Sequence, residues 1–458
     1  MIRKNRSIQL YFGIAATVLP LLLTSCKKFT EIGAPPTQVL SSDVFINDIT
    51  ASSAVMGLYT GNVTTQMLVP YTMYPGMSAD DVQYNTPSSD YDGFETNTVS
   101  INNGINANAW YYAYQYLRNI NYDLVGLTAS TTLTTSVKNQ LLGEAKFLRA
   151  FVLFELVNFY GDVPMPLSNN DNENAFLPRT AAKDVWIQII ADLKEAQSLL
   201  PEAYTGSFRA RANKWAATNL LARAYLYNKD YPNAEAEATK VIDSKVYSIV
   251  APSAAFINSS NEIIWQITNT TGVSTYGANY NSAANSLPTY SLYDTLYKSF
   301  ETGDLRKANW TSDTTASGVT YHRVTKYKTR SGTSGNEYNV VLRFAELYLI
   351  RGEARTQQDN LPLAKADIDV LRTRAGLTGL SATLSHDDML LAIEQERKVE
   401  LFGEWGHRWF DLKRTNRAAI VIGGQKKNTW KNTAVLYPVP DAQRLLNTSL
   451  SQNDGYDK

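Results

Sequence analysis

The sequence has only one cysteine, Cys26, among its 458 residues. A single cysteine forms no internal disulfide and supplies no cysteine-rich metal site. A catalytic thiolate needs a histidine or another cation beside it to lower its pKa. Lys27 and Lys28 follow Cys26, but no histidine occurs before His322. The thiol therefore calls for an explanation other than catalysis or cross-linking.

Histidine is also scarce, with His322, His386 and His407 far apart in the chain. The sequence contains no G-x-S-x-G, Walker loop, dinucleotide-binding glycine motif or H-E-x-x-H. Three scattered histidines give no support to a Ser-His-Asp triad, and no pair of carboxylates is identified by spacing as a glycosidase pair. We therefore predict no catalytic residues, no metal site and no cofactor.

The chain has no excess of either charge, with 43 Lys and Arg against 43 Asp and Glu. This balance removes the electrostatic case for binding nucleic acid. The apolar fraction of 44% is that of an ordinary globular protein. Tyrosine, by contrast, is abundant, with 28 residues. Its flat apolar face and polar tip suit interfaces and sugar rings as well as wet cores.

The residues before Cys26 predict a secretory signal. Arg3, Lys4 and Arg6 form a basic start, an apolar run covers residues 8–23, and small residues precede the cysteine. Leu23-Thr24-Ser25-Cys26 also looks like a bacterial lipobox, in which the cysteine is acylated; an ordinary signal peptide is the alternative. We therefore expect a lipoprotein signal peptide over 1–25, an extended tether over 26–42 and a single domain over 43–458.

Helical patterns dominate the domain. Apolar periodicity predicts helices over 49–59, 110–127 and 137–160, and another that is capped by Thr180 and ends at Pro201. After Leu412 the sequence again favours loops.

Two segments, 215–242 and 344–371, each predict a helix, a short turn and a second helix. Small residues recur twelve positions apart, at Ala222 and Ala234 and at Gly352 and Ala364, as in tetratricopeptide hairpins. Such repeats bury their faces only by stacking, so at least three are expected, with the helices 110–127 and 137–160 as degenerate partners. The predicted fold is mainly α: a tetratricopeptide-repeat scaffold, about 108–245 and 340–414, with large irregular loop insertions and a few short strands.

The two insertions cover about 62–107 and 246–339. The first predicts no stable helix or long strand; the second contains a strand-like run at 263–267 and an alternating stretch at 321–328. Loops on a rigid scaffold are where binding residues tend to lie. Asp80 and Asp81, in the first insertion, fit a polyol contact, a calcium site or a solvated turn, and the turn is favoured.

The stretch 394–414 combines charged and aromatic residues at helical spacing. One interpretation is a charged active site with His407 as the base. The favoured interpretation is a packed aromatic face whose ion pairs lock the helix against the repeats. Just before it, Ser385 and Asp388 predict a capping box that opens a helix.

Four motifs, EAKFLRAFVLFELVNFYGDVPM, LRFAELYLIRGEA, ERKVELFGEWGHRWFDLKR and the closing YPVP…NDGY, resemble the SusD/RagB family of Bacteroidetes outer-membrane lipoproteins. The resemblance covers nearly the whole mature chain. It implies a non-enzymatic nutrient-binding protein, lipid-anchored at Cys26 in the outer membrane and facing the exterior. It also implies that the protein captures a glycan and delivers it to a SusC-like TonB-dependent transporter barrel.

The resemblance transfers no binding residues, because the shared motifs are scaffold segments. Aromatic rings that stack on sugars and polar groups that bind hydroxyls are expected on the insertions. The candidates are Asp80, Tyr84, Asn85, Tyr91, Phe94, Tyr276, Tyr280, Tyr290 and Trp310, with Tyr84 and Trp310 the foremost. The alternatives are a peptide-binding member of the family, a surface glycan-degrading enzyme, and a protein-interaction scaffold that uses only its repeats.

Overall fold

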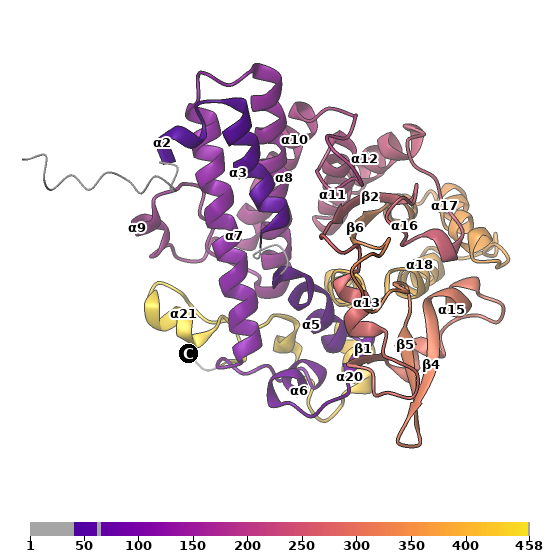
Figure 1. The fold of residues 1–458 in the computed structure, drawn as a ribbon. Coiled ribbons are helices and arrows are strands. Elements are labelled where there is room, and N and C mark those ends of the chain that lie inside the picture. The colour runs from indigo at the N-terminus through magenta and orange to yellow at the C-terminus, as the bar shows by residue number, and fades with distance from the viewer. Residues whose placement is uncertain (1–40, 62–65, 457–458) are drawn as a thin grey trace, which may run out of the picture. The chain divides into compact units, whose positions relative to one another are not determined.

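The computed structural model describes residues 41–61 and 66–456 and divides the chain into two compact units, Met1–Val44 and Phe45–Lys458 (Figure 1). The described part of the first unit contains helix α2 (Ser41–Val44). The predicted signal peptide, Cys26 and residues 27–40 of the predicted tether lie outside the described residues. Within the described residues, no helix combines the length and the apolar character needed to cross a bilayer.

The second unit is mainly helical. Its helices are α3 (Asp48–Thr60), α5 (Pro70–Ser78), α6 (Ser89–Glu95), α7 (Gly104–Ala129), α8 (Thr135–Tyr160), α9 (Asp171–Asn174), α10 (Ala182–Leu199), α11 (Lys214–Tyr227), α12 (Tyr231–Asp243), α13 (Thr275–Tyr280), α14 (Asp294–Tyr297), α15 (Leu305–Trp310), α16 (Phe344–Gln357), α17 (Leu361–Arg374), α18 (His386–Leu401), α19 (His407–Arg414), α20 (Ala418–Gln425) and α21 (Asp441–Leu446). Its strands are β1 (Val82–Tyr84), β2 (Ile263–Ile267), β3 (Tyr290–Leu292), β4 (Thr311–Ala316), β5 (Val319–Val324) and β6 (Asn339–Arg343). Two short 3-10 turns are η3 (Pro252–Ala254) and η4 (Asn432–Val435).

The four predicted N-terminal helices are confirmed as α3, α7, α8 and α10. The predicted cap of α10 is wrong. The residue before the helix is Ala181, and the first turn is instead capped by Asp162, whose Oδ1 accepts a hydrogen bond of 2.8 Å from the Ala182 N–H. Thr180 forms a β-bridge with Val163, so its backbone is held in an extended pairing one residue too early to cap.

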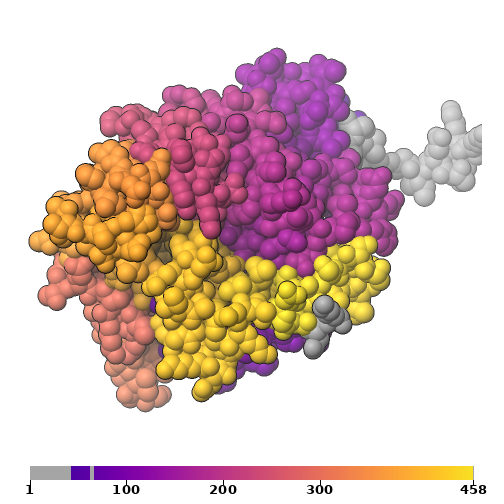
Figure 2. All heavy atoms as spheres, turned by 180° about the vertical axis from the view of Figure 1, so that it is seen from behind, coloured from indigo at the N-terminus to yellow at the C-terminus, as the bar shows by residue number. Residues whose placement is uncertain are grey.

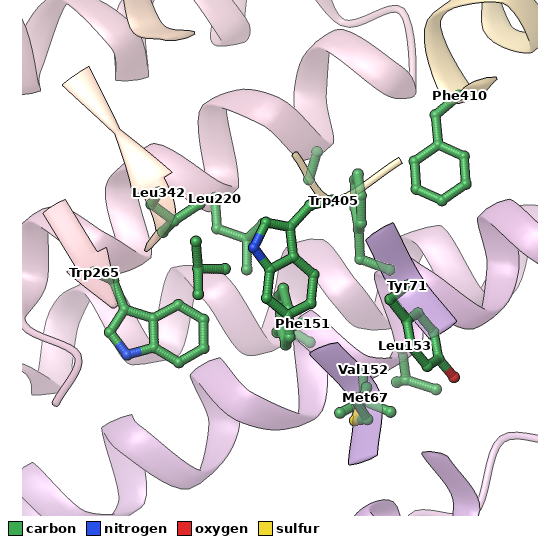
Figure 3. Close-up of a cluster of buried hydrophobic side chains, with 14 of the residues drawn as sticks. Met67, Tyr71, Phe151, Val152, Leu153, Leu220, Trp265, Leu342, Trp405 and Phe410 are labelled. Atoms are coloured by element: carbon green, nitrogen blue, oxygen red, sulfur yellow. The ribbon is translucent and has the colours of Figure 1, made fainter. Parts of the chain in front are cut away.

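Helix α8 is the central element of the core. It packs against α3, α7, α10 and α11, and buried residues lie on all of its sides in its second half. Phe151, Val152 and Leu153 are consecutive and all buried (Figure 3). Phe151 lies between Trp265 and Trp405, with ring centroids 5.2 and 5.1 Å away. Burial of each such side chain stabilises the fold by about 1.5–3 kcal/mol. Because buried residues lie on all sides of the second half of α8, this part of the helix is surrounded by the core and does not present a single apolar stripe to it.

Both predicted helical hairpins are confirmed, as α11–α12 and α16–α17, and α12 packs on α16. Gly352 lies where α16 packs on α17. A Cβ added there would come 2.9 Å from Ile368 Cδ1, so the Ile368 side chain would have to shift to accept a larger residue. The two hairpins and the C-terminal helices (magenta, orange and yellow) meet on the face seen in Figure 2.

The first insertion is more ordered than predicted. It contains α5, β1, α6 and the start of α7, and all nine residues of α5 are buried. Proline and glycine in this segment led to the prediction of turns. Pro70, however, occupies the first turn of α5, where a missing N–H costs nothing, and packing against α7 and α19 stabilises the rest. The prediction of no helix over 62–107 was therefore wrong.

The C-terminal region was also predicted with too little helix. Residues 418–425 form α20 despite the pair Gly423 and Gly424. Trp430 explains why glycine is needed there, because a Cβ at Gly423 would come 2.8 Å from its Cδ1. Ser385 caps α18 as predicted, with Oγ accepting from the Asp388 N–H at 3.2 Å.

The strands form three antiparallel pairs in the described residues: β1 with β3, β2 with β6 and β4 with β5. The predicted strand over 263–267 is confirmed as β2. The predicted alternation over 321–328 is confirmed only to Val324, where β5 ends. The β4–β5 hairpin projects at the lower edge of the molecule in Figure 1.

The charged stretch 394–414 forms two helices, because Gly403 and Gly406 adopt positive φ angles of 66° and 67° between α18 and α19. Its charges pair with other elements, as the packing interpretation predicts. Arg414, for example, bonds Glu353 of α16 at 2.7 Å. We define the Glu400 network as Glu400 and the three arginines that contact it: Arg306 (3.0 Å), Arg343 (2.9 Å) and Arg374 (2.5 Å).

Candidate functional site

The two insertions meet in a short sheet. Strands β1 and β3 pair in antiparallel register, with Tyr84 opposite Tyr290 and Gln83 opposite Ser291. The pairing continues for one residue, since the Asn85 N–H donates to the Thr289 carbonyl at 3.1 Å. Residues about 200 positions apart in the chain are thereby joined at one surface, with α6 packed against β1.

Four tyrosines lie together at this junction, and we call Tyr84, Tyr91, Tyr280 and Tyr290 the tyrosine cluster. The Tyr84 and Tyr91 rings are stacked, with centroids 4.1 Å apart and planes at 24°. Tyr290 contacts Tyr84 at 5.2 Å, Tyr91 at 6.3 Å and Tyr280 at 6.2 Å between centroids. Tyr84 and Tyr91 are half-buried, whereas Tyr280 and Tyr290 are buried. The two outer rings therefore pack against Tyr290, which in turn packs against Tyr280.

Burial governs the chemistry of the inner rings. It raises the pKa of Tyr290 above its ordinary value, and the neighbouring Tyr91 and Tyr74 add to this shift. Burial likewise raises the pKa of Tyr280. Both buried phenols therefore stay neutral, so the interior beneath the outer rings carries no tyrosinate charge.

Polar side chains flank the tyrosine cluster and are held in fixed orientations. Asn85 donates from Nδ2 to the Pro288 carbonyl at 2.9 Å, and its Oδ1 accepts from Ser291 Oγ at 3.1 Å. Gln83 Nε2 donates to Ser291 Oγ at 3.3 Å, and Glu95 accepts from the Tyr84 N–H. Such prearranged donors and acceptors lose little side-chain entropy when a ligand replaces water.

Asp80 and Asp81 anchor the base of β1. Both are buried, so the favoured interpretation of a solvated turn was wrong. Asp80 binds Lys398 Nζ at 2.8 Å and Arg408 Nε at 2.7 Å, and these cations hold its pKa below the ordinary value despite burial. No group of three or more metal-ligating side chains occurs among the residues that the structure describes. Asp80 therefore fixes β1 to the C-terminal helices, and its buried carboxylate is engaged by these two cations.

Asp81 behaves differently from its neighbour. Its Oδ2 accepts a long 3.3 Å bond from the Gly403 N–H, and its Oδ1 has no hydrogen-bond partner. Burial, with the charge of Asp80 beside it, raises the pKa of Asp81 to about 7. The carboxyl group directly before β1 thus has a pKa close to neutral pH.

The remaining predicted residues are packed in the interior. Phe94 is buried against Tyr74, and Tyr276 lies beneath Tyr280 with its hydroxyl 2.9 Å from Thr72 Oγ1. Trp310 is fully buried, and its indole N–H donates to the Pro252 carbonyl at 2.8 Å. Because it has no exposed ring face, the expectation that Trp310 contacts ligand is not supported.

Cations explain the position of Trp310. Lys326 Nζ lies 4.8 Å from its ring centroid, and the guanidinium carbons of Arg374 and Arg343 lie 5.2 and 5.8 Å away. Aromatic faces stabilise buried cations in this way. Trp310 thus covers the Glu400 network.

The alternative of His407 as a catalytic base is not supported either. Its side chain is 4% exposed, and burial, with Arg223 and Arg397 nearby, holds its pKa well below the ordinary value. The sequence reasoning, for its part, missed Gln83, Ser291 and Tyr74. Alternation in β1 and β3 was the available signal for the first two, but strands of three residues are too short to detect reliably.

Two family models match the chain. The model described as SusD family matches residues 223–456, which is more than half of the chain. The model described as "Starch-binding associating with outer membrane" matches residues 35–226.

Similar proteins and structures agree with these matches. SusD-like protein P2 of Formosa agariphila is 27% identical over 427 residues, which span 78% of this chain and 82% of the relative. A SusD superfamily protein from Bacteroides vulgatus has a TM-score of 0.78 at 19% identity, with 90% of this chain and 100% of the other covered. Surface glycan-binding protein A from Bacteroides thetaiotaomicron, in complex with laminarihexaose, has a TM-score of 0.76 at 20% identity, covering 89% and 99%.

Proposed function

This chain belongs to the SusD family, and from that premise we propose that it captures a glycan and delivers it to a SusC-like TonB-dependent transporter in the outer membrane. Proteins of this family are carbohydrate-binding proteins and not enzymes. The observation that carries the proposal is the tyrosine cluster, where two insertions place half-buried rings beside oriented amide groups. An aromatic platform flanked by a few fixed polar groups suits a pyranose, which has apolar faces and a hydroxyl-bearing edge.

The ligand surface that we propose consists of Tyr84, Tyr91 and Asn85. These residues combine partial exposure with a fixed position, which the other candidates lack. Tyr290 packs against both outer rings, and Tyr280 packs against Tyr290. Two aromatic rings beside an oriented amide, with no charged side chain among the three, favour a neutral glycan over a charged peptide.

We expect the double variant Tyr84→Ala, Tyr91→Ala to bind its glycan about ten- to a hundredfold more weakly, because two aromatic contacts of about 1 kcal/mol each are lost. Calorimetry with laminarihexaose, maltohexaose, cellohexaose and xylohexaose measures this. Tyr84→Phe, which keeps the ring, should retain most of the affinity, and Trp310→Phe should leave it unchanged. Equal affinity of the double variant and the wild type would refute the surface.

For the membrane, we propose that residues 1–25 are removed and that Cys26 carries the lipid. We expect the protein isolated from membranes to have an acylated Cys26 at its mature N-terminus, measured by mass spectrometry. Cys26→Ser should move the protein to the soluble fraction, because a lipid anchor of at least two chains is lost. An unmodified Cys26, or membrane retention of the serine variant, would contradict the anchor. Co-purification of a barrel protein from the same membranes in detergent tests the transporter partner.

A further inference from the structure

A second cavity lies on the helical side of the unit, and we call it the α7 groove. Its volume is about 560 Å³, and it is bounded by the N-terminal half of α7, the segment 164–175, and α21 with the turn that follows. Asn447 closes one end, with Nδ2 donating to the Leu177 carbonyl at 2.9 Å. In Figure 1, α9 and α21 (yellow) lie on the same side of α7. The groove shares no lining residue with the tyrosine cluster.

Aromatic rings form one wall of the groove. Trp110 and Tyr114 pack with centroids 4.8 Å apart, and Tyr114 is fixed by its hydroxyl, which donates to the Pro164 carbonyl at 2.9 Å. Tyr111 lies beside them and is 49% exposed. Its hydroxyl accepts from Gln115 Nε2 at 3.3 Å. The groove therefore presents one open ring next to two rings that are held in place.

The polar groups of the groove carry no net charge. Arg118 binds Asp171 through Nε and Nη2, at 2.9 and 2.6 Å, and Tyr122 donates its hydroxyl to the same carboxylate at 2.9 Å. The ion pair thus satisfies the charge of each partner. Arg118 Nη1 and the side-chain amide of Gln443 have no protein hydrogen-bond partner within residues 41–61 and 66–456. Arg118 Nη1 and the Gln443 amide nitrogen can therefore donate hydrogen bonds to a neutral, hydroxyl-bearing ligand, and the Gln443 amide oxygen can accept one.

We propose that the α7 groove is a second glycan-binding site, which takes a short neutral oligosaccharide segment with a sugar ring on Tyr111 and hydroxyl groups at Arg118 and Gln443. A cavity of this volume, with aromatic walls and few polar groups, has the usual character of a small-ligand site. The balanced ion pair disfavours anionic and cationic ligands, which would have to break it. The proposal rests on the glycan-binding function above and adds a second place on the same chain where the glycan is held.

The test compares four forms of the purified chain by calorimetry with the same four hexaoses: wild type, the loop variant (Tyr84→Ala, Tyr91→Ala), the groove variant (Tyr111→Ala, Gln443→Leu) and their combination. Tyr111 and Gln443 lie at least partly in solvent, so their replacement should leave the thermal melt unchanged. We expect the groove variant to lose about tenfold in affinity at one of two sites. Tyr338→Ala, a half-buried tyrosine outside both surfaces, is the matched control and should behave as the wild type.

The outcomes separate the two proposals. Both sites are supported if each variant binds the glycan more weakly than the wild type and the combined variant does not bind it. Loss in the loop variant with wild-type binding by the groove variant overturns the α7 groove and leaves the proposed function intact. Loss only in the groove variant overturns the tyrosine cluster as the glycan surface. Absence of binding to all four hexaoses by the wild type counts against both.

Discussion

Replacing Glu400 with glutamine should lower the free energy of unfolding by about 3–5 kcal/mol, the usual cost of breaking a buried ion pair. Glu400 is fully buried and faces Arg306, Arg343 and Arg374 at 2.5–3.0 Å. These cations hold its pKa well below the ordinary value even though burial opposes this. The folded protein thus depends on the negative charge, and glutamine would leave three desolvated guanidinium groups without it.

Glu262 provides a matched control for this prediction. It is equally buried and also contacts Arg343, at 2.5 Å, but its second arginine, Arg374, is 3.6 Å away. Burial raises the pKa of Glu262, so the folded state disfavours its charge, whereas it favours that of Glu400. Glu262→Gln should therefore cost only about 1–2 kcal/mol. Urea unfolding of both variants at pH 7 measures the two free energies of unfolding. Equal losses of free energy in Glu400→Gln and Glu262→Gln would contradict the prediction that the fold depends on the charge of Glu400.

Asp81→Asn should stabilise the protein at pH 8 and change its stability little at pH 4. In the unfolded chain the Asp81 carboxyl has its ordinary pKa of 3.8, whereas in the folded protein burial raises the pKa to about 7. Between these values the folded state holds a proton that the unfolded state has released. The contribution of Asp81 is therefore fully present below pH 3.8 and is lost as the pH rises through 7, at about 1.4 kcal/mol per pH unit.

Asparagine cannot ionise, so the variant avoids that loss. The difference in unfolding free energy between Asp81→Asn and the wild type should grow to a few kcal/mol between pH 4 and pH 8, while other titrating groups cancel. Asp80→Asn is the opposing control. It removes the carboxylate that Lys398 and Arg408 bind, and it should destabilise the protein at pH 8. If the difference in unfolding free energy between Asp81→Asn and the wild type did not change between pH 4 and pH 8, the raised pKa of Asp81 would be refuted.

The scaffold was predictable because its signals are local. The period of apolar residues and the small residues at Ala222, Ala234, Gly352 and Ala364 depend only on neighbours in the sequence. Helix α5 was missed because its proline and glycine residues are typical of turns, and only burial on every side compensates for them. That burial comes from helices on either side of it in the chain, including α19, whose contacts no local pattern reveals.

The sequence could indicate the two insertions as the region of the proposed site, but not which of their residues lie together. The choice of tyrosines from two insertions is consistent with the pairing of Tyr84 and Tyr290, which the structure places opposite each other. Trp310 shows the limit of this approach. The Trp310 ring is packed against Lys326, Arg343 and Arg374, which come from three later segments of the chain. The residues next to Trp310 in the sequence therefore do not indicate that its ring is buried. The α7 groove was not predicted, because its walls come from three segments of the chain that lie far apart in the sequence.

The pairing of β1 with β3 has a consequence for the order of folding. A loop of about 200 residues separates the two strands, and closing a loop of that length costs entropy before any contact repays it. As the chain is synthesised, Tyr84 and Tyr91 are therefore present long before Tyr290 is available to support them. The tyrosine cluster thus forms only after the chain has reached β3, and a product truncated before β3 would contain Tyr84 and Tyr91 without the Tyr290 ring that packs against them.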